Sequence, residues 1–408
     1  MALDKIHGIL YGGSMLFERK MLLKLQEEAS TKEIIVMTGM RRVGKTTLFR
    51  ILFDWIKSDN KVFLDLENPL EQKIFEEKDY NNIWANLKSF GMTNREKAYI
   101  FLDEIQASPE TVKAVKYLYD HYDVKFFITC SSSFYLKNLF PESLAGRKII
   151  LELNELDFEE FLAFKNKKKE FEQDLEKKVK KKNEIEYETI RPLYDEYLNF
   201  GGFPQVALEE NQERKREHLK DIFKSYFEKD VQKLADFRDV GIFRDLLLLL
   251  LNRVGSRLDI SKLCSEIGIS RQTVYSYVVF LSKTYMIELV PPYTKNPDRE
   301  ISLAKKVYVC DNGFANLFGR NDEGAMLENA VFRNLKKYGK ICYYQKRSGV
   351  EIDFILPEVP AAIEVKNRAA GFDLKKTNRI ADEIGIEKCY VAAKEFSREN
   401  GFIPAQDI

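Results

Sequence analysis

Short apolar runs alternate with amphipathic segments between about residues 33 and 163. Helical patterns such as the one that begins at Lys45 separate these runs. Five runs rich in β-branched and aromatic residues predict strands, at residues 33–38, 61–66, 98–102, 125–129 and 148–153. Strands that alternate with helices indicate a parallel sheet with crossover helices, and the apolar character of the strands fits burial on both faces. The pattern therefore predicts an α/β domain.

The pattern changes beyond this domain. Residues 259–274 have the layout of a helix, a glycine turn and a second helix, with Ser270 placed to cap the second helix, and residues 286–293 predict the strand of a wing. We expect five regions: an N-terminal segment, the α/β core, a helical region, a winged helix and a second mixed α/β region, at residues 1–30, 31–163, 164–236, 237–300 and 301–408.

Composition is that of a globular protein. Of 408 residues, 45% are hydrophobic and 32% charged, and the net charge is +1, so any surface for nucleic acid must come from a local basic patch. Residues 165–182 hold nine lysines and four acidic residues. This segment is either a solvated helix or insertion loop, or a surface that faces DNA.

Several classes of protein are disfavoured. The longest aliphatic run, residues 246–251, is too short to span a membrane, and no secretory signal is apparent, so we expect a soluble, cytoplasmic protein. The five cysteines are single and the three histidines lie far apart. This spacing argues against zinc sites, disulfide frameworks and a Ser-His-Asp hydrolase.

Residues 39–46 match the phosphate-binding pattern G-x-x-x-x-G-K-[ST], between a predicted strand and a predicted helix. Glycines let the backbone curl so that its N–H groups face a phosphate, and the helix presents its positive end to the same anion. Lys45 can reach the β- and γ-phosphates, and the Thr46 hydroxyl can bind Mg²⁺. The sequence predicts that ATP and Mg²⁺ bind here, through Gly39, Arg42, Val43, Gly44, Lys45, Thr46 and Thr47.

Two acids follow the third predicted strand. Asp103 is expected beside the metal, and Glu104 is placed to polarise a water for attack on the γ-phosphate. Residues 129–133 either sense the γ-phosphate or form a turn of small residues. Arg147 is either an arginine finger that offsets developing charge or part of a surface salt bridge.

These stretches together resemble prokaryotic ATPases of the AAA+ type. The resemblance rests on residues 38–48, 102–106, 142–147, 156–161 and 197–204. It implies that a helical lid, a winged helix and a C-terminal domain of uncertain function follow the ATPase core, and it covers nearly the whole chain.

The C-terminal region holds a second candidate site. Strands predicted at residues 349–356 and 362–366 would bring Asp353, Glu364 and Lys366 together, and Glu328 from a helix could complete the cluster. Metal-dependent phosphodiester cleavage needs carboxylates that hold Mg²⁺, here Asp353 and Glu364, and a lysine. The pattern resembles the PD-(D/E)xK nuclease fold. A relic that only binds nucleic acid or protein is the alternative.

The predicted winged helix offers a third candidate site. Arg271, Gln272 and Tyr275 stand where a second helix could enter the major groove of DNA. The alternative is a module for packing or for docking proteins.

The leading hypothesis is a protein that binds ATP, hydrolyses it with Mg²⁺ and couples hydrolysis to movement of the winged helix and nuclease-like domain on DNA. One alternative is a metal-dependent nuclease gated by nucleotide. The other is a regulator that binds DNA and holds ATP without catalysis. If Arg147 acts in trans, a homo-oligomer is expected.

Overall fold

The computed structural model describes residues 9–11, 14–16, 19–134, 146–231, 239–294, 296, 298, 300, 303–346 and 348–408. The contacts between residues divide the chain into two compact units. Unit 1 comprises Met1–Asn154 with Lys283–Tyr285, and unit 2 comprises Glu155–Ser282 with Met286–Ile408.

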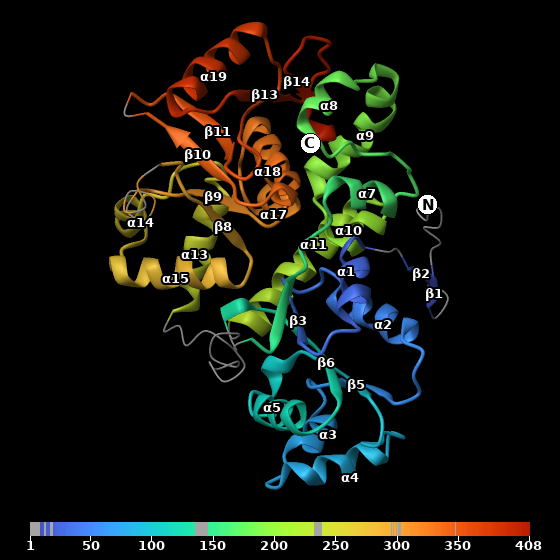
Figure 1. The fold of residues 1–408 in the computed structure, drawn as a ribbon. Coiled ribbons are helices and arrows are strands. Elements are labelled where there is room, and N and C mark those ends of the chain that lie inside the picture. The colour runs from blue at the N-terminus through green and yellow to red at the C-terminus, as the bar shows by residue number, and fades with distance from the viewer. Residues whose placement is uncertain are drawn as a thin grey trace. The chain divides into compact units, whose positions relative to one another are not determined.

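Unit 1 is built on a sheet of five parallel strands in the order β4-β5-β6-β3-β7 (Figure 1). The strands are β3 (Ile34–Thr38), β4 (Lys61–Asp65), β5 (Ala98–Asp103), β6 (Val124–Cys130) and β7 (Lys148–Glu152). All five, including β6, correspond to runs predicted from the sequence, to within one residue at each end. The prediction of a parallel α/β core is confirmed.

Helices connect these strands. They are α1 (Met21–Glu28), α2 (Lys45–Trp55), α3 (Pro69–Gln72), α4 (Ile83–Lys88) and α5 (Thr111–His121), with short 3₁₀ turns at Lys73–Phe75, Tyr80–Asn82 and Ile105–Ala107. A two-stranded ribbon, β1 (Ile9–Tyr11) and β2 (Ser14–Leu16), precedes α1.

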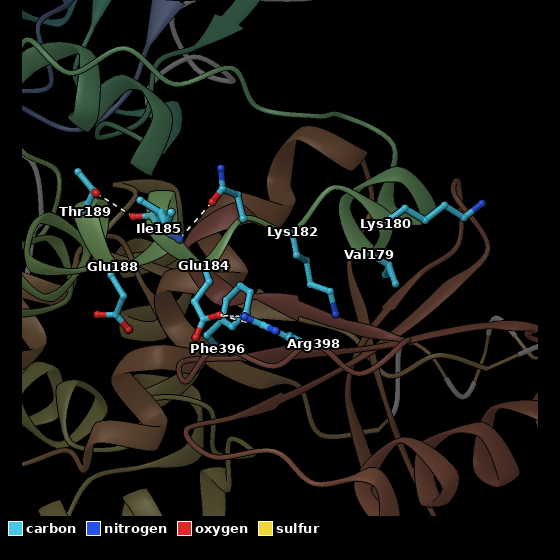
Figure 2. A pocket seen from close by; sticks show the side chains of 10 residues that line it. Val179, Lys180, Lys182, Glu184, Ile185, Glu188, Thr189, Phe396 and Arg398 are labelled. Carbon is cyan, nitrogen blue, oxygen red and sulfur yellow. Dashed lines mark hydrogen bonds and ion pairs between the residues drawn. The ribbon is translucent and has the colours of Figure 1, made fainter.

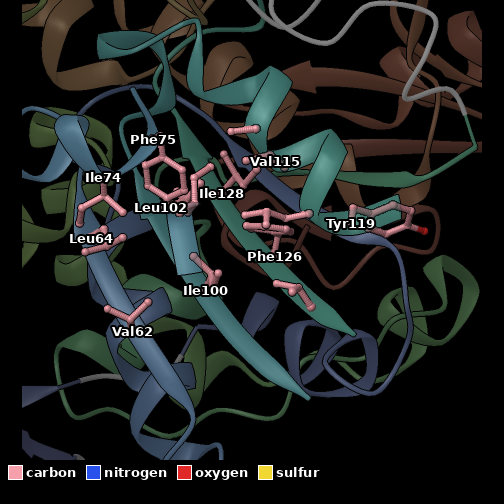
Figure 3. Packing of buried hydrophobic residues seen from close by; sticks show 14 of the residues in the cluster. Val62, Leu64, Ile74, Phe75, Ile100, Leu102, Val115, Tyr119, Phe126 and Ile128 are labelled. Carbon is pink, nitrogen blue, oxygen red and sulfur yellow. The ribbon is translucent and has the colours of Figure 1, made fainter. Parts of the chain in front are cut away.

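One hydrophobic cluster supports the sheet of unit 1. Figure 3 shows side chains of β4, β5 and β6, among them Leu64, Leu102 and Ile128, against Phe75 and against Val115 of α5. These side chains are almost completely buried. Burial of this apolar surface fixes the strands, and with them the loops at their carboxyl ends.

Unit 2 begins with helices. They are α7 (Phe158–Phe164), α8 (Leu175–Lys180), α9 (Glu184–Phe200), α10 (Pro204–Leu208) and α11 (Gln212–Tyr226), followed by a π-helical turn at Phe227–Val231 and α13 (Val240–Leu251). The lysine-rich segment is partly turned inward: Lys169 pairs with Asp407 over 2.5 Å, and Lys178 donates to the main-chain oxygen of Ile408 over 2.9 Å. These lysines are therefore not part of a free basic surface.

The two helices predicted on either side of a glycine turn are present as α14 (Ile260–Ile267) and α15 (Arg271–Lys283). Gly268 adopts the left-handed conformation between them, and the Ser270 side chain accepts a hydrogen bond from the Thr273 N–H. Strand β8 (Ile287–Val290) follows and pairs with β9 (Lys306–Val309), so a hairpin crosses the boundary predicted at residue 300.

The rest of unit 2 is α17 (Asn312–Phe318), α18 (Glu323–Leu335) and a mixed sheet in the order β10-β11-β12-β13-β14. Its elements are β10 (Cys342–Gln345), β11 (Glu351–Leu356), β12 (Ala361–Lys366), α19 (Gly371–Ile384), β13 (Lys388–Ala393) and β14 (Phe402–Pro404). 3₁₀ turns lie at Lys336–Tyr338 and Ala405–Asp407. Within the described part of the chain, no helix has the length and apolar character needed to cross a bilayer.

Candidate functional site

The predicted phosphate loop joins the carboxyl end of β3 to the start of α2. Gly39 and Gly44 have φ angles of +146° and +101°. A Cβ on Gly39 would lie 2.1 Å from the Leu153 carbonyl oxygen, whereas a Cβ on Gly44 would meet nothing within 4 Å. Glycine is therefore required at residue 39 by packing, while Gly44 borders open space that a ligand can enter.

Lys45 is buried at the base of this loop. Its ammonium group donates hydrogen bonds to the carbonyl oxygens of Gly39 and Met40 over 2.8 and 2.9 Å. Only 4% of the residue is exposed. The positive charge thus lies inside the curve of the loop, where phosphate oxygens could replace the carbonyls as its partners.

Asp103 ends β5 and reaches the first turn of α2. Its Oδ2 accepts a hydrogen bond of 2.8 Å from the Thr46 hydroxyl, and its Oδ1 accepts one from the Thr129 hydroxyl. Burial raises the pKa of the Asp103 carboxyl, and the two hydroxyl donors oppose that shift. A hydroxyl and a carboxylate in contact are hard oxygen ligands of the kind that Mg²⁺ prefers.

Glu104 follows directly and is held in an unusual conformation. Its φ is +55°, and its N–H donates to the Thr129 hydroxyl over 2.8 Å. One carboxylate oxygen lies 3.6 Å from the Arg41 guanidinium, and the other accepts from the Gln106 side-chain amide. The same amide nitrogen reaches Ser131 Oγ over 3.0 Å.

Arg41 and Gln106 were not among the predicted site residues. The signal that could have found them is local: Arg41 lies inside the loop motif, and Gln106 is a polar residue two positions after Glu104. Gln106 is buried, and its Oε1 has no hydrogen-bond partner among the described residues. An unpaired buried acceptor is costly, so Gln106 Oε1 is an acceptor that a donor entering the site could satisfy.

Arg147 is not brought to the loop. Arg147 immediately precedes β7, and Lys148 of β7 pairs with Ile34 at the amino end of β3. The Arg147 Nε contacts Asp120 over 3.1 Å. Because the loop follows the carboxyl end of β3, a span of roughly 15–20 Å separates the two places. A role for Arg147 at the nucleotide of its own chain therefore has no geometric support. The motif residues that precede it, 142–145, lie outside the described residues.

The second predicted cluster does assemble, in unit 2. Strands β11 and β12 are antiparallel, and Asp353 Oδ2 accepts a hydrogen bond from the Val365 N–H over 2.9 Å. The Lys366 ammonium lies 2.7 Å from Glu364 Oε1. Glu364 Oε2 is buried without a partner among the described residues.

Lys306 on β9 is an unpredicted member of this cluster. Its ammonium lies 3.2 Å from Glu328, 3.5 Å from Glu351 and 3.6 Å from Asp353, and the residue is 2% exposed. Burial lowers the pKa of Lys306, but its three carboxylate neighbours outweigh burial and raise it overall. Tyr308 also donates a hydrogen bond to Glu328.

Excess negative charge remains in the cluster. Burial, followed by the charge of Asp353, raises the pKa values of Glu328 and Glu364. Nevertheless, no group of three or more acidic, histidine or cysteine side chains in the described residues is arranged to hold a metal ion. Any metal here would thus depend on fewer side-chain ligands.

The residues predicted to contact DNA lie on the exposed side of α15. Arg271, Gln272 and Tyr275 are all exposed, and Arg271 donates to Ser261 Oγ over 2.9 Å. Tyr275 is 56% exposed, and Val279, one helical turn later, is also exposed. The helix therefore presents a face of mixed polar and apolar character.

A groove of about 990 Å³ lies elsewhere in unit 2, at the start of α9 (Figure 2). Two of its three cations are already engaged: Arg398 pairs with Glu184 over 2.5 Å, and Lys182 donates to the Ser397 carbonyl oxygen over 2.9 Å. None of the predicted site residues lines this groove.

Known families match three parts of the chain. Residues 31–162 match the family described as AAA domain. Residues 191–324 and 323–402 match two domains of unknown function, DUF8612 and DUF4143. The loop, the acidic strand end and this match define a P-loop ATPase domain of the AAA type.

The particular family follows from whole-chain relatives. The uncharacterized protein MJ1544 of Methanocaldococcus jannaschii is 30% identical over 382 residues, which are 90% of this chain and 80% of that protein. An uncharacterized protein of Haemophilus influenzae is 25% identical, over 91% of this chain and 90% of its own length. The chain belongs to the family of MJ1544.

Among solved structures, the Aeropyrum pernix ORC1 protein in complex with DNA aligns with 82% of this chain and 97% of that chain, at 12% identity. The TM-score of 0.32 is too low to support an inference from that protein.

Proposed function

We propose that this protein binds ATP with Mg²⁺ at residues 39–47 and hydrolyses it. The observation that carries the proposal is the hydrogen bond between Thr46 and Asp103, because it joins the loop to the acidic strand end and puts two oxygen ligands side by side. The open space beside Gly44 and the buried ammonium of Lys45 fit a polyphosphate.

Each residue has a distinct task in this proposal. Lys45 binds the terminal phosphates, and Thr46 and Asp103 hold the metal, while the backbone from Arg42 to Thr47 surrounds the phosphates. Mg²⁺, when bound, neutralises negative charge on the phosphate oxygens.

Glu104 accepts a proton from the attacking water. Arg41 and Gln106 hold its carboxylate, so its orientation is set before the substrate arrives. The unpaired Gln106 Oε1 is a suitable acceptor for the second proton of the same water. Arg147 contributes only if it comes from a neighbouring subunit, which requires a homo-oligomer.

The energy of hydrolysis would move the regions that follow the core. We propose that residues 164–236 serve as a helical lid and 237–300 as a winged helix, and that α15 meets DNA through Arg271, Gln272 and Tyr275. The support is that all three side chains are exposed on α15, the second helix of the pair formed by α14 and α15.

An ATPase assay with and without duplex DNA, at several protein concentrations, tests this function. Glu104→Gln should bind ATP and hydrolyse it roughly 10²–10⁴ times more slowly, since it removes the general base. Glu110→Gln, which changes an exposed glutamate of unit 1, is the matched control. Undiminished turnover in Glu104→Gln would contradict the proposed mechanism, and undetectable turnover in the wild type would favour a non-catalytic regulator.

A second candidate function is metal-dependent cleavage of nucleic acid by unit 2. It is favoured by the convergence of Glu328, Asp353 and Glu364 with Lys366, and by the unpaired oxygen of Glu364. In this candidate Asp353 and Glu364 hold the metal, and Lys366 positions the nucleophile. Lys306 supplies further positive charge beside the carboxylates.

Incubation of the full chain with Mg²⁺ and duplex DNA, single-stranded DNA or RNA tests the second candidate. Cleavage should be lost in Asp353→Asn and kept in Glu395→Gln, which changes an exposed glutamate of the same unit. Failure to cleave any of the three substrates would remove this candidate and leave the ATPase proposal untouched.

A further inference from the structure

Three residues between α15 and β8 belong to a different unit from their neighbours. Lys283, the last residue of α15, and the two residues that follow it associate with unit 1, whereas Ser282 and Met286 belong to unit 2. The chain therefore enters unit 1 at the end of the second helix of the helix-turn-helix and leaves it again before β8.

Side chains at the end of β3 and shortly after β6 hold this segment. The Ser132 and Ser133 hydroxyls donate to the Lys283 carbonyl oxygen over 3.2 and 2.9 Å. A hydrogen bond of 2.8 Å joins Thr38 Oγ1 to the Tyr285 hydroxyl. The segment is thus tied by side-chain hydrogen bonds and not by apolar packing alone.

The residues that hold the segment adjoin the proposed nucleotide site. Thr38 is the last residue of β3 and immediately precedes Gly39. Ser132 and Ser133 come shortly after Thr129, whose hydroxyl contacts Asp103. Both attachments therefore lie at the carboxyl ends of strands beside the site: β3, which leads into the phosphate loop, and β6, whose Thr129 contacts Asp103.

Tyr285 is in a strained conformation. Its φ of +65° is left-handed, which a residue with a Cβ adopts only when its surroundings enforce it. Burial raises the pKa of the Tyr285 hydroxyl to about 12, so the group stays protonated and able to hydrogen-bond at ordinary pH. The bond to Thr38 is one of the contacts that hold Tyr285 in this conformation.

We propose that Tyr285 is a positioning residue that links occupancy of the phosphate loop to the connection between α15 and β8. The inference rests on the proposed function. A nucleotide in the loop changes the positions of Gly39 and Asp103, and Thr38 and Ser133 pass that change to Tyr285 and Lys283. The change then reaches the helix that carries Arg271, Gln272 and Tyr275 because Lys283 is part of that helix.

Amide hydrogen exchange of the full chain, with and without a non-hydrolysable ATP analogue and Mg²⁺, tests the link. In the wild type, the analogue should change exchange in residues 271–290 roughly fivefold or more. Tyr285→Phe removes only the hydroxyl and should abolish that response while the affinity for the analogue stays within roughly threefold of wild type. Thr38→Val removes the same bond from its other side and should have the same effect on exchange.

Tyr122→Phe is the matched control, since it also removes a tyrosine hydroxyl bond of unit 1, here to Asn81 over 2.7 Å. It should leave the response intact. A response that survives in Tyr285→Phe, or its absence in a wild-type protein that binds the analogue, would overturn the link. A large loss of affinity in Tyr285→Phe would also overturn it, because Tyr285 would then act in binding itself. No binding of the analogue to the wild type would instead overturn the proposed function.

Discussion

The Thr46 hydroxyl donates a hydrogen bond of 2.8 Å to Asp103 Oδ2. This bond connects the first turn of α2 with the end of β5, two elements that are far apart in the sequence. Under the proposed function, Thr46 and Asp103 are the residues that would hold Mg²⁺.

Thr46→Val tests this assignment because valine keeps the shape of threonine and lacks its oxygen. The affinity for ATP in the presence of Mg²⁺ should fall about tenfold or more, which corresponds to one lost contact to a charged group. The affinity measured in EDTA should change little. Calorimetric titration under both conditions measures the difference, with Thr189→Val, an exposed threonine of α9, as control. An equal loss with and without Mg²⁺ would contradict a metal-binding role.

Substitution of the two glycines of the loop by alanine should have different effects on stability and on affinity for ATP. Gly39→Ala should destabilise unit 1, because its Cβ would lie 2.1 Å from the Leu153 carbonyl oxygen. Gly44→Ala meets no atom within 4 Å and should cost only about 1–2 kcal/mol of backbone strain, while it lowers affinity for ATP by filling the space meant for phosphate.

Thermal unfolding and ATP titration of both variants measure these effects. Gly44→Ala with wild-type affinity would show that the phosphates do not approach this glycine. A fully stable Gly39→Ala would show that the contact with Leu153 yields at little cost.

Local signals in the sequence were sufficient for the strands and the loop. The run at residues 33–38 became β3 (Ile34–Thr38), and the glycines and Lys45 occupy the curve that the motif predicts. These features depend on residues that are neighbours in the chain, so the hydrophobic periodicity and the positions of glycines in the sequence predict them.

Contacts between distant segments could not be predicted in the same way. Lys306 lies on β9, whereas Glu328 lies on α18 and Asp353 on β11, and nothing local in the sequence specifies that these three elements meet. The position of Arg147 likewise follows from the parallel register of β7 beside β3, which puts a residue from a promising motif at the opposite end of the strand from the loop.

Asp311 should make stability depend on pH. Its two oxygens accept hydrogen bonds from the N–H groups of Gly202 and Gly313 over 2.6 and 2.8 Å. Burial, and then the charge of Glu155, raises the pKa of Asp311 to about 7. Between its unfolded pKa of about 4 and pH 7, the folded chain holds a proton that the unfolded chain has lost, so stability falls as pH rises through this window and levels off above it.

Asp311→Asn should remove this contribution, at most about 1.4 kcal/mol per pH unit, and should lower stability because an amide fits two N–H donors less well than a carboxyl group. Urea denaturation of wild type and variant from pH 4 to 8 measures the difference in slope. Parallel curves would show that Asp311 titrates normally in the folded protein.

Lys306→Met should reveal how far the Lys306 ammonium balances the negative charge of the carboxylate cluster of unit 2. The substitution leaves Glu328 and Asp353 buried without their shared cation, and loss of one partner from a buried ion pair costs roughly 3–5 kcal/mol. The variant should therefore unfold at a lower temperature than the wild type. Because its cluster is more negative, Mg²⁺ or Mn²⁺ should raise its melting temperature more than that of the wild type.

Lys340→Met is the control, since Lys340 pairs with Glu300 over 2.6 Å at a largely exposed position and the pair should contribute at most about 1 kcal/mol. Thermal scans of the three proteins with increasing divalent cation measure the effect. Identical shifts in all three would mean that the cations bind elsewhere and that Lys306 does not compete with a metal. A selective shift in Lys306→Met would mean that this ammonium already occupies part of the space and charge that a metal at Asp353 requires.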